Sequence, residues 1–201
     1  MTRRLALPAA LLVAALSFFV TLSDATGQSG GGQAGWTPLF DGKNLDAFTR
    51  LGDANWQIVD GAVQSDKGAG FLVTKQSYAN FQLRAEFWAD EKANSGIFVR
   101  CTDPQKINAE NSYEVNIYDT RPDPSYGTGA IVNFAKVSPM PKAGGKWNTY
   151  DVTFNGDTMT VILNGQKTVD AHKDSKFASG PIGLQYAAGV IKWRKVEIRP
   201  L

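Results

Sequence analysis

Two Asn-Gly pairs near the carboxyl end constrain the fold more than any other feature of the sequence. Asn155-Gly156 and Asn164-Gly165 each lie between runs in which apolar and polar residues alternate. Asn-Gly favours the two-residue turns that join antiparallel strands, because both residues adopt positive φ at little cost. Alternation with a period of two indicates strands, because successive side chains leave opposite faces of a sheet. The sequence therefore predicts β-hairpins over residues 147–169.

Short runs of the same kind recur from about residue 57 to the end of the chain. Residues that favour turns separate them, and neither a sustained helical pattern nor an internal repeat is present. We therefore predict an all-β fold in which two antiparallel sheets pack face to face. The other predicted strands lie at 57–64 around an Asp-Gly turn, 71–74, 81–88, 95–100, 112–119, 129–132, 181–185 and 191–198. The side chains expected between the sheets include Phe81, Leu83, Ala85, Val115, Ile117 and Val152.

Residues 1–25 have the pattern of a secretory signal peptide. Arg3 and Arg4 precede a long apolar run, and small residues follow it at the expected cleavage position. An uncleaved membrane anchor is the alternative, because the apolar run is nearly long enough to span a bilayer. We predict cleavage, and hence an exported, periplasmic or secreted protein without a stable membrane anchor. Residues 26–35 then form a flexible Gly-rich linker, and residues 36–201 form one domain.

Composition narrows the classes of partner and of chemistry. Residues 1–25 carry two basic residues and one acidic residue, so the remaining chain has 19 basic and 18 acidic side chains. A near-neutral chain without a basic cluster argues against nucleic acid as a partner. Cys101 is the only cysteine, which excludes an internal disulfide, and we expect it to be a small buried residue rather than a reactive thiol.

The number of histidines limits the kinds of metal site that the chain can form. His172 is the only histidine, which excludes any site that needs two histidines. No Asp-rich loop has the spacing of a calcium site. We predict no cofactor, and a divalent metal stays an open alternative.

Polar side chains on the predicted strands form the candidate site. In the run 112–119, Glu114, Asn116 and Tyr118 share one face, and Glu86 lies on the polar face of the run 81–88. Buried charge is costly unless it is paired, so we expect these two faces to lie side by side on one open, concave sheet surface. The candidate residues on this surface or at its rim are Glu86, Arg100, Glu114, Asn116, Tyr118, Asp119, Gln185 and Tyr186.

Seven short motifs, taken together, resemble a known family. They are Leu-Phe-Asp-Gly-Lys-Asn-Leu (39–45), Asn-Ser-Gly-Ile-Phe-Val-Arg (94–100), Tyr-Glu-Val-Asn-Ile-Tyr-Asp (113–119), Thr-Gly-Ala-Ile (128–131), Trp-Asn-Thr-Tyr (147–150), Leu-Asn-Gly (163–165) and Gly-Pro-Ile-Gly-Leu-Gln (180–185). In this order they resemble the 3-keto-disaccharide hydrolase domain family, also described as 3-keto-glucoside lyase/hydratase. The resemblance implies a jelly-roll sandwich of the concanavalin A-like or laminin-G-like type. It also implies an exported bacterial protein that acts on sugars oxidised at carbon 3.

The resemblance extends to single positions, with one departure. The residues that match polar positions of the family are Arg100, Glu114, Asp119 and Gln185, and Asn116 stands where the family often has Gln. After Gln185 the family commonly has an acid and a histidine before the next glycine. This chain has Tyr-Ala-Ala at 186–188 instead, which favours a binding role over the family's usual chemistry.

A ketone at carbon 3 of a sugar acidifies the proton on carbon 2, and this defines the roles that we assign. Glu114 is the candidate base, Arg100 the candidate stabiliser of the enolate, and Glu86 the candidate second acid. The predicted sugar-binding residues are Tyr118, Asn116, Asp119, Gln185 and Tyr186.

Structural alternatives accompany these roles. Arg100 and Glu114 could instead form a cross-strand ion pair, Glu86 could be a solvated surface charge, and Asp119 could cap a turn. Each aromatic candidate could fill the core or the sheet surface rather than stack on a sugar.

The sequence alone leaves three candidate functions open. The first is an exported enzyme that cleaves 3-keto-glycosides by elimination at carbons 1 and 2 followed by hydration, with a small-molecule or oligosaccharide sugar as its ligand. The second is a non-catalytic carbohydrate-binding module on the same fold. The third is a cell-envelope interaction domain without a sugar ligand. The fold by itself does not choose among them.

Overall fold

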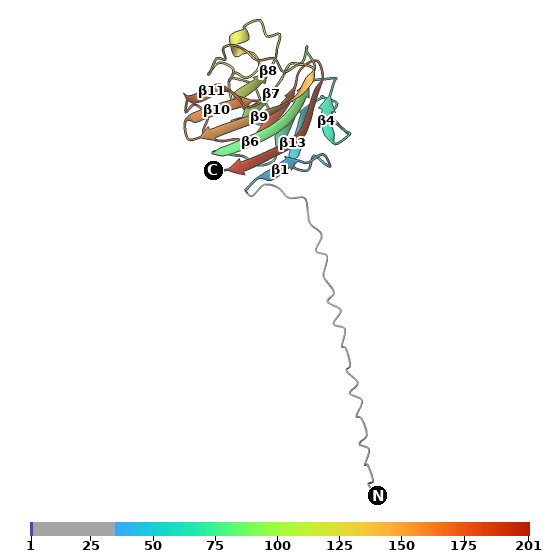
Figure 1. Cartoon of the computed structure of the whole chain (residues 1–201). Coiled ribbons are helices and arrows are strands. Elements are labelled where there is room, and N and C mark those ends of the chain that lie inside the picture. Colours follow the sequence, from blue (N-terminus) through green and yellow to red (C-terminus); the bar gives the residue numbers. More distant parts are fainter. Residues whose placement is uncertain (2–34) are drawn as a thin grey trace. The chain divides into compact units, whose positions relative to one another are not determined.

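The computed structural model describes Met1 and residues 35–201, and within that range the strands form two antiparallel sheets packed face to face (Figure 1). The large sheet runs in the order β11 (Gln166–Lys173), β10 (Thr158–Leu163), β9 (Lys146–Asn155), β6 (Phe81–Ala89), β13 (Ile191–Pro200), β4 (Ala62–Ser65) and β3 (Gln57–Val59), with β1 (Thr37–Phe40) paired to β13. The small sheet runs in the order β2 (Phe48–Gly52), β5 (Gly70–Thr74), β12 (Gly183–Tyr186), β7 (Ser95–Val99) and β8 (Tyr113–Ile117). The predicted all-β sandwich is confirmed.

Two of the three predicted Asn-Gly and Asp-Gly turns have the backbone that their residues predict, whereas between β9 and β10 only Gly156 has a positive φ, because Asn155 still belongs to β9 and pairs with Thr158. Asp60 and Gly61 join β3 to β4 with φ values of 51° and 74°, and Asn164 and Gly165 join β10 to β11 with φ values of 51° and 81°. Two consecutive positive φ values are the signature of the turn whose twist matches antiparallel strands. These hairpins fix the register of the large sheet.

The core lies between the two sheets and is built from the apolar positions of the alternating strands. The six predicted core side chains are each at most 1% exposed. Phe87 stacks on Tyr150 with ring centroids 5.1 Å apart, and it also contacts the fully buried Trp193. Burying one large apolar side chain contributes about 1.5–3 kcal/mol, so this layer dominates the stability of the fold.

The two polar strand faces that were expected to lie side by side point in opposite directions. β6 lies between β9 and β13 in the large sheet, whereas β8 is an edge strand of the small sheet. The apolar faces of both strands enter the same core, so their polar faces leave the sandwich on opposite sides. The predicted single concave surface is therefore wrong. Alternation shows which residues share a face, but it does not show which sheet a strand joins.

Three further segments differ from the prediction, and the first is β1, a strand paired with β13 in a part of the chain where none was predicted. β2 was not predicted, because its short sequence Phe-Thr-Arg-Leu-Gly carries no clear alternation, and it pairs with β5. Residues 129–132 form an isolated bridge at Ile131 rather than a strand. Their backbone covers the free edge of β8 through Asn116 N–H to Ala130 O and Val132 N–H to Glu114 O, both 3.0 Å.

The predicted signal peptide and nearly all of the predicted linker lie outside the residues that the structure describes, which leave out 2–34. Among residues 35–201, no helix has the length and apolarity needed to cross a bilayer.

Candidate functional site

Glu114, Asn116 and Gln185 come together on the outer face of the small sheet, around Gly96, and we name these three residues the Glu114 cluster. Asn116 of β8 pairs with Gly96 of β7. Leu184 of β12 pairs with Ile97, so Gln185 follows beside Gly96 from the other side. Glycine leaves space above the sheet here, and Glu114 leans into it. A Cβ atom on Gly96 would lie 3.3 Å from Glu114 Cγ and 3.4 Å from Oε1.

The Glu114 carboxyl is desolvated and has no partner. The residue is only 7% exposed, and within residues 35–201 its side-chain oxygens accept no hydrogen bond and form no ion pair. Burial raises the pKa of this carboxyl to about 7, and the positive charge of Arg121 opposes the shift. A carboxyl whose pKa lies near neutral pH can accept a proton and return it, as general acid–base catalysis requires.

The other two members of the Glu114 cluster hold buried oxygen acceptors. Asn116 Nδ2 donates a hydrogen bond to Tyr126 O at 2.7 Å, which leaves Asn116 Oδ1 facing away from that contact. Asn116 Oδ1 and Gln185 Oε1 are both buried and lack a hydrogen-bond partner in the described chain. Each such atom costs about 1–3 kcal/mol. A ligand that carries several hydroxyl donors would satisfy both.

Arg100, the predicted enolate stabiliser, lies elsewhere. Its φ of +53° interrupts the alternation of β7 and turns the side chain away from the outer face. Arg100 Nε donates to Ala79 O at 2.9 Å, and Nη1 donates to Gly156 O at 2.9 Å and to Phe177 O at 3.2 Å. Neither the predicted catalytic placement nor the alternative ion pair with Glu114 is present among the described residues. Arg100 instead ties together three loops.

Glu86, the predicted second acid, is also remote from the Glu114 cluster. It belongs to β6 and faces outward from the large sheet, where its Oε2 accepts a hydrogen bond from Arg194 Nε at 2.7 Å. Arg194 in turn lies over the ring of Trp147, 4.0 Å from its centroid. The predicted placement of Glu86 is wrong, for the reason given for β6 and β8.

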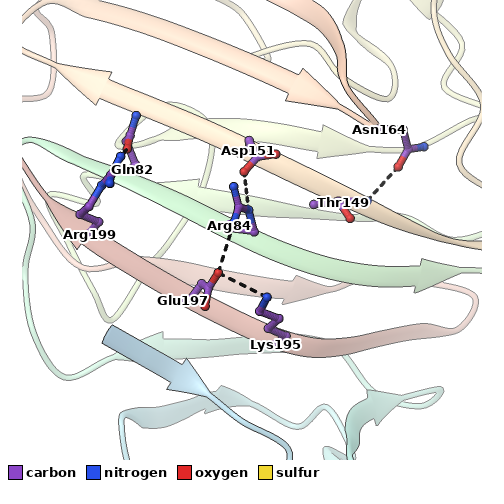
Figure 2. A network of polar contacts seen from close by, with 8 residues as sticks. All are labelled: Gln82, Arg84, Thr149, Asp151, Asn164, Lys195, Glu197 and Arg199. Carbon is purple, nitrogen blue, oxygen red and sulfur yellow. Dashed lines mark hydrogen bonds and ion pairs between the residues drawn. The ribbon is translucent and has the colours of Figure 1, made fainter. Parts of the chain in front are cut away.

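The outer face of the large sheet is a ladder of paired charges (Figure 2). Figure 2 shows side chains from β6, β9 and β13 and from the turn after β10: Gln82, Arg84, Thr149, Asp151, Lys195, Glu197, Arg199 and Asn164. Arg84 lies between two carboxylates, 2.7 Å from Asp151 Oδ1 and 3.6 Å from Glu197 Oε1. Cross-strand charge pairs of this kind stabilise a sheet by about 0.2–1 kcal/mol each. Their acids and bases neutralise one another, unlike the unpaired carboxyl of Glu114.

Asp119 has a structural role. Its Oδ1 accepts a hydrogen bond from Thr128 Oγ1 at 2.6 Å, and its Oδ2 accepts bonds from the backbone N–H groups of Ala143 and Gly144, each at 2.9 Å. The carboxylate is thus occupied in joining the two ends of the segment that follows β8. This agrees with a structural role, as in the alternative that Asp119 caps a turn, rather than with a sugar ligand.

Tyr118 and Tyr186, the two tyrosines predicted to bind sugar, lie in different environments. Tyr186 is 4% exposed, donates its hydroxyl to Gly189 O at 3.1 Å and packs edge-on against Trp56 in the core. Its predicted sugar contact is wrong, because Gln185 faces outward and the next residue of the strand must face inward. Tyr118 is half-buried just beyond β8, at a position that continues the face of Glu114 and Asn116.

One charged residue whose charge acts on Glu114 was missed. Arg121 lies in the turn after β8, where its N–H contacts Tyr118 O at 3.4 Å, and its charge acts on Glu114. No periodicity marks it, because residues 121–128 form an irregular segment around the short 3-10 helix η1 (Pro124–Tyr126). The sequence feature that could have indicated Arg121 was its position shortly after the predicted polar strand at 112–119.

Residues 35–201 contain no group of three His, Cys, Asp or Glu side chains that could hold a metal ion. The oxygens of the Glu114 cluster are of the type that hard divalent cations bind, so a divalent metal there stays an open alternative. Cys101 is buried in a small apolar cluster with Phe98 and Ile107, and burial raises the pKa of its thiol to about 12. The expectation of a small buried cysteine is confirmed.

A comparison with known protein families shows which family the chain belongs to. A model described as the 3-keto-alpha-glucoside-1,2-lyase-like domain matches residues 35–199. The chain belongs to this family. No curated protein matches it.

Solved structures agree with the family. A candidate glycosyl hydrolase from Parabacteroides distasonis is 20% identical, with a TM-score of 0.73 over 83% of this chain and 94% of its own. A second one from the same organism is 29% identical, with a TM-score of 0.68 over 83% and 99%. A carbohydrate-binding module of family 66 from Bacillus subtilis is 16% identical, with a TM-score of 0.55 over 82% and 95%, and it shows the fold alone. This family member therefore shares its sandwich fold with candidate glycosyl hydrolases and with a carbohydrate-binding module.

Proposed function

We propose that this protein cleaves the glycosidic bond of 3-keto-glycosides by elimination followed by hydration. The observation that carries the proposal is the Glu114 carboxyl, which is buried, unpaired in the described chain and shifted in pKa to about 7. A carboxyl in a structural ion pair would have a partner, and the opposite charge would lower its pKa. The family membership and the names of the similar structures support a sugar as the substrate.

The proposed reaction has two stages. Glu114 removes the proton from carbon 2, and the electron pair of that C–H bond forms an enolate with the carbonyl at carbon 3. The enolate collapses, restores the carbonyl and forms the carbon 1–carbon 2 double bond while the glycosidic oxygen leaves and takes up a proton. Water then adds to carbon 1 and a proton returns to carbon 2, which yields an alcohol and a 3-keto sugar. One carboxyl with a pKa near 7 can serve both proton transfers.

The acceptors of the Glu114 cluster suit the rest of the sugar. Asn116 Oδ1 and Gln185 Oε1 accept hydrogen bonds from hydroxyl groups and hold carbon 2 near Glu114. A site built to bind hydroxyls rejects ligands that lack them, because its buried oxygens would then stay unpaired.

The test is turnover of an aryl 3-keto-glucoside, followed by release of the aryl alcohol. Wild-type protein should turn the substrate over, and Glu114→Gln should lower kcat about 10²- to 10⁴-fold with little change in KM. Glu110→Gln, which neutralises an exposed carboxyl, is the matched control. Wild-type protein without turnover of either anomer would overturn the proposal.

The second candidate is a non-catalytic carbohydrate-binding module. A hollow of about 300 Å³ on the outer face of the large sheet favours it, because Trp36 lies there with Arg84 and Arg199 each 5.1 Å from its ring. The Tyr-Ala-Ala sequence at 186–188 also favours it. Calorimetry would support this candidate if wild-type protein and Glu114→Gln bound a 3-keto-glucoside equally and neither turned it over.

We also propose that the protein is exported after cleavage near residue 25 and works in the periplasm or outside the cell. The order of basic, apolar and small residues at its amino end supports this. Amino-terminal sequencing of secreted material should begin near residue 26, and material that begins at Met1 would contradict it.

A further inference from the structure

A half-buried aromatic ring lies on the same outer face as the Glu114 cluster, two strands away from Gly96. Phe71 of β5 pairs with Gln185 of β12, and Gly96 of β7 lies on the other side of Gln185. Neighbouring strands are about 4.8 Å apart, so the backbones at Phe71 and Gly96 are about 10 Å apart. Leu51 of β2 pairs with Phe71 and continues this row outward. The row therefore changes from polar to apolar as it leaves the Glu114 cluster.

The Phe71 ring is held in place by apolar contacts. It meets the ring of Phe98 edge-on, with the two centroids 5.2 Å apart. Phe98 is in turn the cross-strand neighbour of Glu114. Gly183 leaves room for the ring, because a Cβ atom there would lie 3.2 Å from both Phe71 Cδ1 and Ile107 Cδ1. The ring is therefore fixed over β12, and Phe98 connects it to the strand position of Glu114.

The chain itself covers two of the directions that lead away from the Glu114 cluster. Beyond β8, the segment of η1 closes the face, because one of its carbonyl groups accepts a hydrogen bond from Asn116 Nδ2 at 2.7 Å. Along the strands, Ile107 covers the sheet as part of a small apolar cluster. Phe71 and Leu51 form the half-buried edge of that apolar cluster. A group linked to a sugar in the Glu114 cluster therefore finds accessible apolar surface in the direction of Phe71.

The chemistry of this surface suits an aromatic group better than a second sugar. The neighbours of Phe71 are Leu51, Phe98 and Ile107, whose side chains have no hydrogen-bonding atoms. An aromatic ring on Phe71 gains buried area and a ring–ring interaction. A second sugar would instead place hydroxyl groups beside apolar side chains that cannot pair with them, which costs free energy. Hydroxyl recognition is thus confined to the polar end of the row.

We propose that Phe71 binds the group linked to carbon 1 of the substrate, and that this group is aromatic. This inference rests on the proposed function, because it needs the keto sugar to lie between Asn116 and Gln185 with carbon 2 at Glu114. The bond that breaks then joins a sugar over Gly96 to a ring that contacts Phe71. The substrates are accordingly 3-keto-glycosides of phenols, and the alcohol that leaves is a phenol.

The test measures the binding of phenyl and methyl 3-keto-glucosides by calorimetry in the Glu114→Gln background, which should bind these ligands without turnover. The phenyl glycoside should bind about tenfold more tightly, because part of its ring is buried on Phe71. Adding Phe71→Ala should weaken phenyl binding about three- to tenfold and leave methyl binding nearly unchanged. Phe71→Leu keeps the apolar packing without the ring, so it should lose part of the preference for phenyl.

The matched control is Trp147→Ala in the same background. Trp147 is an aromatic side chain on the outer face of the large sheet, where it is 37% exposed, and it lies away from the Glu114 cluster. Its removal should leave both dissociation constants unchanged. Circular dichroism and urea unfolding of each variant check that the fold is retained.

The outcomes separate this inference from the function on which it rests. Wild-type protein that releases no phenol overturns the proposed function, whereas calorimetry decides whether Phe71 contacts the aromatic group. Equal binding of the two glycosides, or no binding of either, overturns the inference. An equal loss for both in Phe71→Ala also overturns it, because a purely structural role would weaken both alike. Tighter binding of a 3-keto-disaccharide than of the phenyl glycoside would assign the surface to a second sugar and overturn the aromatic preference.

Discussion

Replacing Glu114 with glutamine should make the protein more stable at neutral pH. The ordinary pKa of a Glu carboxyl is 4.5, and burial raises that of Glu114 to about 7. Each pKa unit corresponds to about 1.4 kcal/mol, so the folded wild type loses about 3 kcal/mol of stability when this carboxyl ionises. Glutamine has nearly the same shape and carries no charge at any pH, so it avoids this loss.

The direction of the pKa shift decides how the stability changes with pH. The folded-state pKa is raised, so the stabilising contribution of the protonated form is complete below about pH 4.5 and is lost as pH rises through about 7. The wild type should therefore fall behind Glu114→Gln progressively across this window. Below it, the two proteins should differ little.

Urea unfolding at a series of pH values measures this directly. The quantity to plot is the free energy of unfolding of Glu114→Gln minus that of the wild type, because all other titrating groups then cancel. Glu110→Gln serves as the control, since this carboxyl is exposed and its replacement should give a flat difference. A flat difference for Glu114→Gln as well would refute the interpretation of Glu114 as a desolvated, unpaired carboxyl.

Three further predictions follow from single contacts. The kcat/KM of the wild type should rise with pH through about 7, because the base must be ionised, and a pH–rate profile that is level there would exclude Glu114 as the base. Arg100→Met should lower the free energy of unfolding by about 3 kcal/mol, because it leaves the carbonyl groups of Ala79, Gly156 and Phe177 without their donor; urea unfolding unchanged from wild type would contradict this. Gly96→Ala should raise KM, because its methyl group would lie 3.1 Å from Val115 O and 3.3 Å from Glu114 Cγ; steady-state kinetics identical to wild type would show that the space above Gly96 is not used by substrate.

Much of the fold could be predicted from local rules. The Asn-Gly and Asp-Gly turns and the period-two alternation gave most strands and the buried side chains, because turn chemistry and burial act within a few residues. Sheet membership could not be predicted in this way. β6 and β8 have similar patterns, yet long-range pairing places them in different sheets, and their polar faces cannot meet.

The candidate site was predicted only in part, because local rules hold within one strand and do not show how distant segments come together. Glu114 and Asn116 were correctly placed on one outer face, because both lie within a single regular strand. Arg100 was misplaced, because one residue with a φ of +53° reverses the direction of its side chain, and alternation cannot foresee this. Arg121 was missed, because only the folded loop brings it to Glu114.

The proton on carbon 2 offers the most direct measurement. Wild-type protein would be given an aryl 3-keto-glucoside with hydrogen or with deuterium at carbon 2, and the initial rates of aryl alcohol release would be compared. Elimination that begins with proton removal by Glu114 predicts slower turnover of the deuterated substrate and, in heavy water, solvent deuterium at carbon 2 of the 3-keto sugar at early times. Equal rates together with retention of the original hydrogen at carbon 2 would mean that water attacks carbon 1 directly, and the proposed role of Glu114 would be contradicted.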